Sequence, residues 1–243
     1  MKKINLRMFL ILIVVTCFYE SVLAQNKEGS NMTLTAKQQS IVPIAALTAQ
    51  GELEQLKSAL YEGLDAGLTV NQIKEIMVHT YAYCGFPRSI RGLQTFIEVM
   101  EEREAKGISD IEGVEASDLN DDRSKYDRGK ANLETLIGRS LDGPQTGYAA
   151  FAPVIEIFLK EHLFADIFDR DVLTYAEREL VTVSVISAIG KAEPMLRSHL
   201  TICLNVGYTP EQLYEFVGIV KTTAGKKEAK AAQAVLNEVL ENR

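Results

Sequence analysis

Two residues near the C-terminal end of the chain form a candidate proton-transfer pair. His199 lies at the start of a helical run that follows a predicted turn at Gly190–Pro194. Imidazole changes charge near neutral pH, so His199 can be a general acid or base. Glu179 comes five residues into its own predicted helix and, if buried, could orient His199 or act as an acid–base group itself. The alternatives are a core histidine bonded to a carbonyl and an exposed glutamate near a helix N-terminus.

Two arginines close to Glu179 are candidates for substrate binding. Arg178 adjoins it in the sequence, and Arg170 precedes the same predicted helix. A guanidinium binds a carboxylate through two parallel hydrogen bonds, so both residues could hold an acidic substrate. Successive helix residues point about 100° apart, so Arg178 and Glu179 should face different partners. A surface salt bridge is the alternative for each arginine.

A second cluster of polar and reactive side chains lies in the first half of the chain. His79 and Tyr83 are four residues apart and can share one face of a helix. We predict that both contribute to a substrate site, together with the adjacent Cys84. The alternative is that these side chains fill a core layer, and for Cys84 we favour that alternative. Tyr81 completes the cluster.

Cysteine and histidine usage gives no indication of a metal site. The chain contains no Cys-x-x-Cys pair and no Cys/His cluster with zinc-like spacing, so we predict no metal ligands. Cys84 and Cys203, the two cysteines after residue 24, lie in dissimilar settings, and we do not expect them to form a disulfide. His162 is predicted to lie at the surface.

The helices that must position these side chains are encoded twice, 139 or 140 residues apart. Thr35–Gln38 and Thr174–Glu177 both read Thr-x-x-Gln/Glu, and so do Thr69–Gln72 and Thr209–Gln212. In this capping box the Thr side chain accepts a hydrogen bond from the first turn, and the third residue after it reaches back. A glycine two residues before the second box of each copy suits the end of a preceding helix. The pattern therefore predicts two copies of one helical unit.

The candidate chemistry is not duplicated with the helices. His199 and Glu179 in the second copy stand where the first copy has Ala59 and Ser40. The first copy instead carries the cluster around His79, where the second copy has unrelated residues. We therefore predict one composite pocket built from both copies.

The first 24 residues are predicted to be a secretory signal. Three basic residues precede an apolar run at Met8–Phe18, and Val22–Ala24 offers a cleavage site. The run is too short to cross a bilayer, so we expect export to the periplasm or cell envelope with no membrane anchor after cleavage. The signal holds three basic residues and one acidic residue, so its removal changes the net charge from −7 to −9. Nucleic acid and anionic lipid are therefore not expected partners.

Apolar residues recur at helical spacing through the rest of the chain, and no segment reads convincingly as a strand. The segment from Leu180 to Ile189 is rich in β-branched residues, but its capping box and its apolar character on nearly all sides favour a buried helix. A break is expected at Gly85–Pro87.

We predict an all-α fold. Its parts are a polar leader (25–33), a first repeat (34–105), an acidic linker with bridging helices (106–172), and a second repeat (173–243). The first part of the linker is expected to be solvated and mobile.

These segments resemble the carboxymuconolactone decarboxylase family, within the alkylhydroperoxidase D-like superfamily. Arg170–Leu180, Met195–Leu200 and Asn205–Leu213 carry the family pattern in the second copy, and Ile76–Pro87 carries its later half in the first. The resemblance implies a tandem member of an all-helical family that assembles into trimers or hexamers, so we expect a homo-oligomer such as a dimer or trimer of tandem chains. It also places His199 in the pocket and implies a small-molecule substrate with no metal or organic cofactor.

The hydroperoxidase branch of this superfamily uses two cysteines, seven and four residues before the matching histidine. Those positions hold Ala192 and Met195 here, and Glu52 and Gln55 in the first copy. Peroxide reduction needs a reactive thiolate and a resolving thiol, so this chemistry is disfavoured.

Three functions therefore remain to be compared. The first is a lyase or isomerase acting on a small carboxylated lactone or related acid, with His199 and Glu179 as catalytic residues. The second is an antioxidant reductase in which Cys84 would act alone. The third is a binding or assembly module without catalysis.

Overall fold

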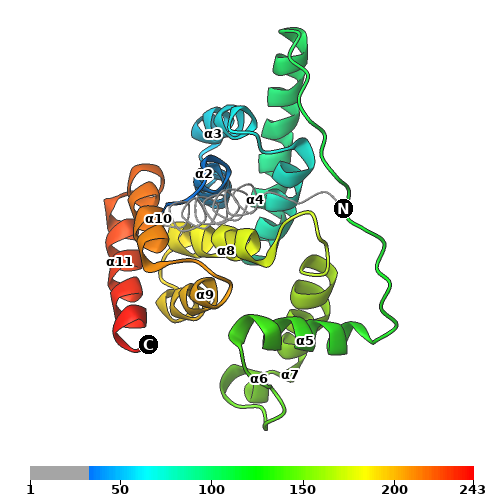
Figure 1. Cartoon of the computed structure of the whole chain (residues 1–243), viewed down its shortest axis with the longest axis vertical. Helices are drawn as coiled ribbons and strands as arrows, with labels where there is room; N and C mark the ends of the chain where they lie inside the picture. Colours follow the sequence, from blue (N-terminus) through cyan, green and yellow to red (C-terminus); the bar gives the residue numbers. More distant parts are fainter. Residues whose placement is uncertain (1–32) are drawn as a thin grey trace, which may run out of the picture.

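The computed structural model describes residues 33–243, which form a helical molecule with no strand in that range, so the all-α prediction is confirmed. The predicted signal and most of the polar leader lie outside the described residues. Within the described range, no helix is both long and apolar enough to cross a bilayer. The helices, shown in Figure 1, are α2 (Ala36–Gln50), α3 (Leu53–Asp65), α4 (Val70–Ala105), α5 (Lys125–Ile137), α6 (Gly147–Phe151), α7 (Pro153–Phe158), the π-helix η1 (Leu159–Ile167), α8 (Tyr175–Ile189), α9 (Glu193–Asn205), α10 (Pro210–Thr223) and α11 (Lys226–Glu241).

The two copies predicted from the sequence are the helices α2–α4 and α8–α11. All four predicted capping boxes form, with Thr35, Thr69, Thr174 and Thr209 as the N-cap residues. Helices α2 and α8 have 15 residues each, and α3 and α9 have 13 each. The repeat in the sequence is therefore a repeat in the structure.

One glycine in each copy breaks the third helical segment. Gly85 has φ 81° and ψ 163° inside α4, and Gly225 has φ 122° and ψ 164° between α10 and α11. Residues with a side chain rarely adopt this conformation, so glycine is needed at both positions. The break predicted at Gly85–Pro87 is confirmed, and the second half of α4 extends beyond the rest of the helices (Figure 1).

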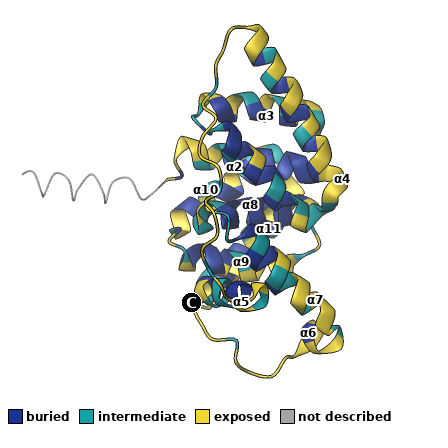
Figure 2. Cartoon of the chain, turned by 90° about the vertical axis from the view of Figure 1, so that its right-hand side faces the viewer, coloured by how far each residue is buried: buried dark blue, intermediate teal, exposed yellow. Residues whose placement is uncertain are grey.

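Helices α2 and α8 pack against each other at the centre of the molecule. Every residue from Arg178 to Ala188 is buried, and α2 is buried almost continuously from Ile41 to Ala49 (Figure 2). A helix that is apolar on nearly all sides is stable only when other helices surround it. This burial outweighs the strand propensity of Val181, Val183 and Val185 and keeps α8 helical.

Each copy holds the first helix of the other copy through one glutamate. Glu75 on α4 accepts a hydrogen bond from Arg178 on α8 at 2.7 Å. Glu215 on α10 accepts one from Gln39 on α2 at 2.8 Å. Glu75 and Glu215 both lie six residues after the capping Thr of their helix. The two contacts are therefore equivalent under the internal repeat.

The acidic segment after α4 is largely exposed, as expected, and its first part is hydrogen-bonded to the start of α4. The backbone amides of Val70 and Asn71 donate hydrogen bonds to the carbonyls of residues 111 and 112, at 3.0 and 2.9 Å. Arg103 binds the carboxylate of Asp110 through two bonds of 2.8 Å. The segment caps the start of α4 and is held there by this nearly buried ion pair.

Loss of that ion pair is expected to release the segment. Asp110→Ala leaves the buried Arg103 guanidinium without its main partner, which we expect to lower the free energy of unfolding by about 1–3 kcal/mol. Limited proteolysis within residues 107–123 should become several-fold faster. The control is Asp118→Ala, which removes an exposed carboxylate from the same segment. Equal cleavage rates for the two variants would contradict the assignment.

Candidate functional site

The pair predicted to move a proton is formed. Glu179 is fully buried on α8, and His199 on α9 has 14% of its side chain exposed. The Nδ1 atom of His199 lies 2.8 Å from Oε2 of Glu179. With Nδ1–H donating to the carboxylate, the Nε2 atom of a neutral His199 is an acceptor and a base. Oε1 of Glu179 is buried and has no hydrogen-bond partner among residues 33–243.

Local sequence explains how the pair meets. The Thr174 capping box starts α8, so Glu179 lies in its second turn on a face covered by α9. The predicted turn at Gly190–Pro194 is present: Gly190 and Lys191 both have positive φ, at 65° and 58°. This turn brings α9 back along α8 and places His199 beside Glu179.

Helix α4 of the first copy brings Tyr83 and His79 to the same place. The Tyr83 ring lies 6.0 Å from the His199 ring and 5.4 Å from the His79 ring, measured between centroids. Tyr83 is partly exposed, whereas His79 is completely buried. The shared helix face predicted for His79 and Tyr83 is confirmed. The candidate residues of both copies therefore form one cluster.

Thr182, which the sequence reasoning did not select, connects these residues. Its Oγ1 atom lies 2.8 Å from Nε2 of His79 and 3.1 Å from the phenolic oxygen of Tyr83. On its other side His79 contacts Arg178, with Nδ1 at 3.3 Å from Nη1. Thr182 lies one helical turn after Arg178, and this spacing is the only sequence signal that could have suggested it.

Both candidate arginines contact a carboxylate that the sequence reasoning missed. Arg178 is fully buried and donates to Oε1 of Glu75 at 2.7 Å, while Arg170 donates to both oxygens of Glu75 at 2.9 to 3.1 Å. Neither arginine bonds Glu179 or His199. Substrate binding by Arg178 and Arg170 therefore stays a prediction, and their observed partner is Glu75. The equivalence of Glu75 and Glu215 in the repeat was the signal that could have found it.

Burial sets the protonation of the two first-copy residues. The pKa of His79 is lowered well below its usual value, first by burial and then by the charges of Arg178 and His199. Burial, with a contribution from the Glu179 carboxylate, raises the pKa of Tyr83 well above its usual range. At neutral pH, His79 is therefore a neutral imidazole and Tyr83 carries its proton.

Cys84 lies beside the cluster but is not bonded to its other members. Its thiol donates to the carbonyl of Thr80 at 3.3 Å, and burial raises its pKa to about 11. Cys84 and Cys203 are both free, in line with the expectation that they form no disulfide. Tyr81 contacts the exposed His162 and stacks on Phe86, and is not bonded to Glu179 or His199. Cys84 remains a predicted lining residue.

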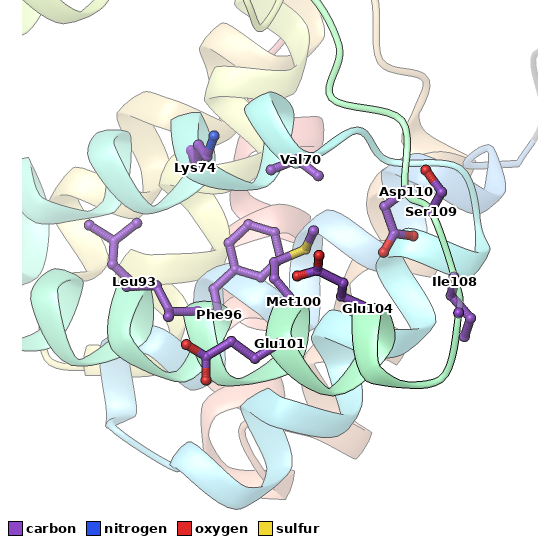
Figure 3. Close-up of a pocket in the computed structure, with 12 residues that line it drawn as sticks. Val70, Lys74, Leu93, Phe96, Met100, Glu101, Glu104, Ile108, Ser109 and Asp110 are labelled. Carbon is purple, nitrogen blue, oxygen red and sulfur yellow. The ribbon is translucent and has the colours of Figure 1, made fainter.

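A separate groove of 790 Å³ lies between α4 and residues 107–110 (Figure 3). Its lining includes the apolar side chains of Phe96 and Met100 and the acidic side chains of Glu101 and Glu104. None of the predicted site residues lines it. Among residues 33–243, no group of three His, Cys, Asp or Glu side chains is arranged to hold a metal ion.

Comparison with known proteins identifies the family of this chain. Residues 19–98 and 154–238, together more than half of the chain, match the model of the carboxymuconolactone decarboxylase family. The chain belongs to this family. It is 27% identical to 4-carboxymuconolactone decarboxylase of Acinetobacter baylyi over 122 residues, which cover 50% of this chain and 90% of that protein. It is 30% identical to an uncharacterized protein of Methanocaldococcus jannaschii over 83 residues, covering 34% of this chain and 78% of that protein.

The buried neutral His79 should make stability depend on pH. Its pKa is lower in the folded than in the unfolded chain, so below pH 6.5 the unfolded chain binds a proton that the folded chain does not. This term is fully present above pH 6.5 and is lost as the pH falls, by up to about 1.4 kcal/mol per pH unit.

We expect His79→Gln to remove this slope from unfolding curves recorded between pH 6.5 and about pH 5. His162→Gln, at an exposed position, is the matched control and should retain the slope. An unchanged slope in His79→Gln would show that another group produces it.

Proposed function

We propose that the protein is a cofactor-free lyase or isomerase acting on a small carboxylated lactone or a related acid. The observation that carries this proposal is the hydrogen bond between Glu179 and His199, which leaves Nε2 as a base beside the Tyr83 ring. Membership of the carboxymuconolactone decarboxylase family supports the reaction class. The name of the Acinetobacter relative supports a carboxylated lactone as the substrate class.

The proposed reaction involves no net oxidation or reduction. The carbon–carbon bond to the substrate carboxylate breaks and CO2 leaves. The electron pair of that bond passes into the conjugated lactone carbonyl and gives an enolate. The enolate carbon then takes a proton from Nε2–H of protonated His199, so that a proton replaces CO2. In an isomerisation, Nε2 of neutral His199 would take a proton from one substrate carbon and return it to another, without loss of CO2.

Glu179 would act as the partner of His199 in this step. Its carboxylate fixes the orientation of the ring and stabilises the imidazolium that carries the proton. Because Glu179 is fully buried, its charge is little screened by water and acts strongly on a neighbour 2.8 Å away. Tyr83 and Cys84, which are partly exposed, would contribute to the substrate-facing wall, and the buried His79 would support Tyr83 from behind.

The two other functions fit the geometry less well. Ala192 and Met195 occupy the positions of the reactive cysteines in the hydroperoxidase branch, and the raised pKa of Cys84 keeps its thiol protonated. A module without catalysis would gain nothing from a buried carboxylate whose second oxygen lacks a partner, because such an atom lowers stability. Residues of this kind are typical of functional sites.

Replacement of His199 tests the proposal. With 4-carboxymuconolactone as the first substrate tried, we expect His199→Ala to lower kcat/KM by about 100-fold or more, since it removes the acid–base group. Glu179→Gln should retain part of the activity. His162→Ala, at an exposed histidine, is the control. Full activity of His199→Ala would contradict the assignment. If the wild-type chain turned over no carboxylated lactone, the non-catalytic function would be favoured.

Cys84 is expected to be unreactive in the native protein. With a pKa of about 11, its thiolate fraction at pH 7 is very small, so alkylation by iodoacetamide should be far slower than in the urea-unfolded chain. Peptide mapping by mass spectrometry locates the label. Rapid labelling together with peroxide consumption that Cys84→Ala abolishes would instead support the reductase function.

A further inference from the structure

Tyr83 belongs to the first copy and lies beside His199 of the second. It is the last member of a hydrogen-bond chain that runs from Arg178 through His79 and Thr182, and the donor and acceptor of the first two bonds can be assigned. Arg178 can only donate hydrogen bonds, so Nδ1 of His79, 3.3 Å from Nη1, is an acceptor. Neutral His79 has one N–H, which must then be on Nε2. This N–H points at the hydroxyl of Thr182, 2.8 Å away. Arg178 therefore determines the tautomer of His79, and His79 donates to Thr182.

The hydroxyl of Thr182 has one proton and two acceptors in reach. These are the carbonyl of Arg178 at 3.0 Å and the phenolic oxygen of Tyr83 at 3.1 Å. The Arg178 carbonyl accepts the backbone N–H of Thr182 within α8 and has a second lone pair, so the Thr182 proton can go to either acceptor. The phenolic oxygen of Tyr83 has no other partner among residues 33–243. A Thr182 proton given to Tyr83 leaves the phenolic proton free for an oxygen atom outside the protein.

We propose that Tyr83 is a catalytic hydrogen-bond donor, which binds the lactone carbonyl oxygen as it becomes an enolate oxygen while His199 moves the proton. This inference rests on the proposed function. The rings of Tyr83 and His199 are adjacent, edge to face, with 6.0 Å between their centroids, so a substrate that contacts Nε2 of His199 would lie beside Tyr83. His79 and Thr182 are positioning residues, because they act only through Tyr83.

The surroundings favour a donor at this position rather than a second base. Burial and the nearby Glu179 carboxylate keep the Tyr83 hydroxyl protonated. A donor that is already oriented stabilises negative charge that develops in the reaction better than mobile water does. The chain through Thr182 and His79 ends at the guanidinium of Arg178, whose positive charge favours the same polarisation. The first copy has Pro43 at the position of Thr182 and cannot build this chain.

Tyr83→Phe removes the hydroxyl and keeps the ring that packs on His79 and His199. We expect kcat to fall by about 100-fold with KM within about 3-fold of wild type, because the lost bond strengthens only as the enolate forms. Thr182→Val should lower kcat by about 10-fold, and Thr182→Ser, which keeps the hydroxyl, should restore it. Unchanged kcat in Tyr83→Phe, with His199→Ala inactive, would overturn this inference and leave the proposed function intact.

Binding measurements give a readout that does not depend on turnover. The probe is tetronic acid, a five-membered lactone with an ionised enol, compared with γ-butyrolactone-γ-carboxylic acid, which has a neutral carbonyl. By calorimetry, Tyr83→Phe should weaken tetronate binding about 10-fold or more and change binding of the neutral lactone by less than about 3-fold. Equal effects on the two ligands would mean that Tyr83 only shapes the site.

The direction of the hydrogen-bond chain can be tested without any ligand. In ¹⁵N NMR spectra of the wild-type protein, His79 should show an unprotonated Nδ1 and a protonated Nε2 at neutral pH, assigned by comparison with His79→Gln. Arg178→Met would remove the donor that fixes this tautomer, provided that it remains folded by circular dichroism. A wild-type His79 with the proton on Nδ1 would overturn the proposed chain, whatever the outcome of the activity measurements.

Discussion

The buried ion pair between Glu75 and Arg178 determines how the two copies face each other. Glu75 has 2% of its side chain exposed and Arg178 has none, so the charge of Arg178 depends on Glu75 for compensation, while Glu75 also binds Arg170. Loss of one partner from such a pair leaves a buried charge and typically costs about 3–5 kcal/mol. The pair fixes α4 against α8, and one turn later the same two helices bring His79 to Thr182. The alignment of the candidate site therefore follows from an interaction that is not itself part of it.

This arrangement explains why polar groups are tolerated in a helix with no solvent-exposed face between Arg178 and Ala188. Glu179 and Thr182 lie on that helix and find their partners on α9 and α4, at 2.8 Å in both cases. The cost of burying them is offset by hydrogen bonds that cross between helices. The same bonds set the donor and acceptor roles of the candidate site, so the stability of the helix pair and the polarity of the site have one origin.

Local signals in the sequence were sufficient for the helices, because capping boxes and glycines act within a few residues. Thr35, Thr69, Thr174 and Thr209 marked helix starts that the structure confirms. The pairing of Glu179 with His199 was also expected, although the sequence alone left exposed alternatives open. Glu75 and Thr182 were missed because their roles depend on contacts across 103 residues, which no local pattern encodes. The hydrogen bonds that hold residues 111 and 112 against the start of α4 were missed for the same reason, since they join backbone groups about 41 residues apart.

The internal repeat also has an evolutionary consequence. In a symmetric dimer of identical chains, one codon change alters both equivalent positions at once. Here Ala59 and His199, or Pro43 and Thr182, are encoded separately and can diverge independently. A substitution at one position therefore leaves the equivalent position in the other copy unchanged. Two copies in one chain can thus contribute different side chains to one cluster, as Tyr83 of the first copy and His199 of the second do here.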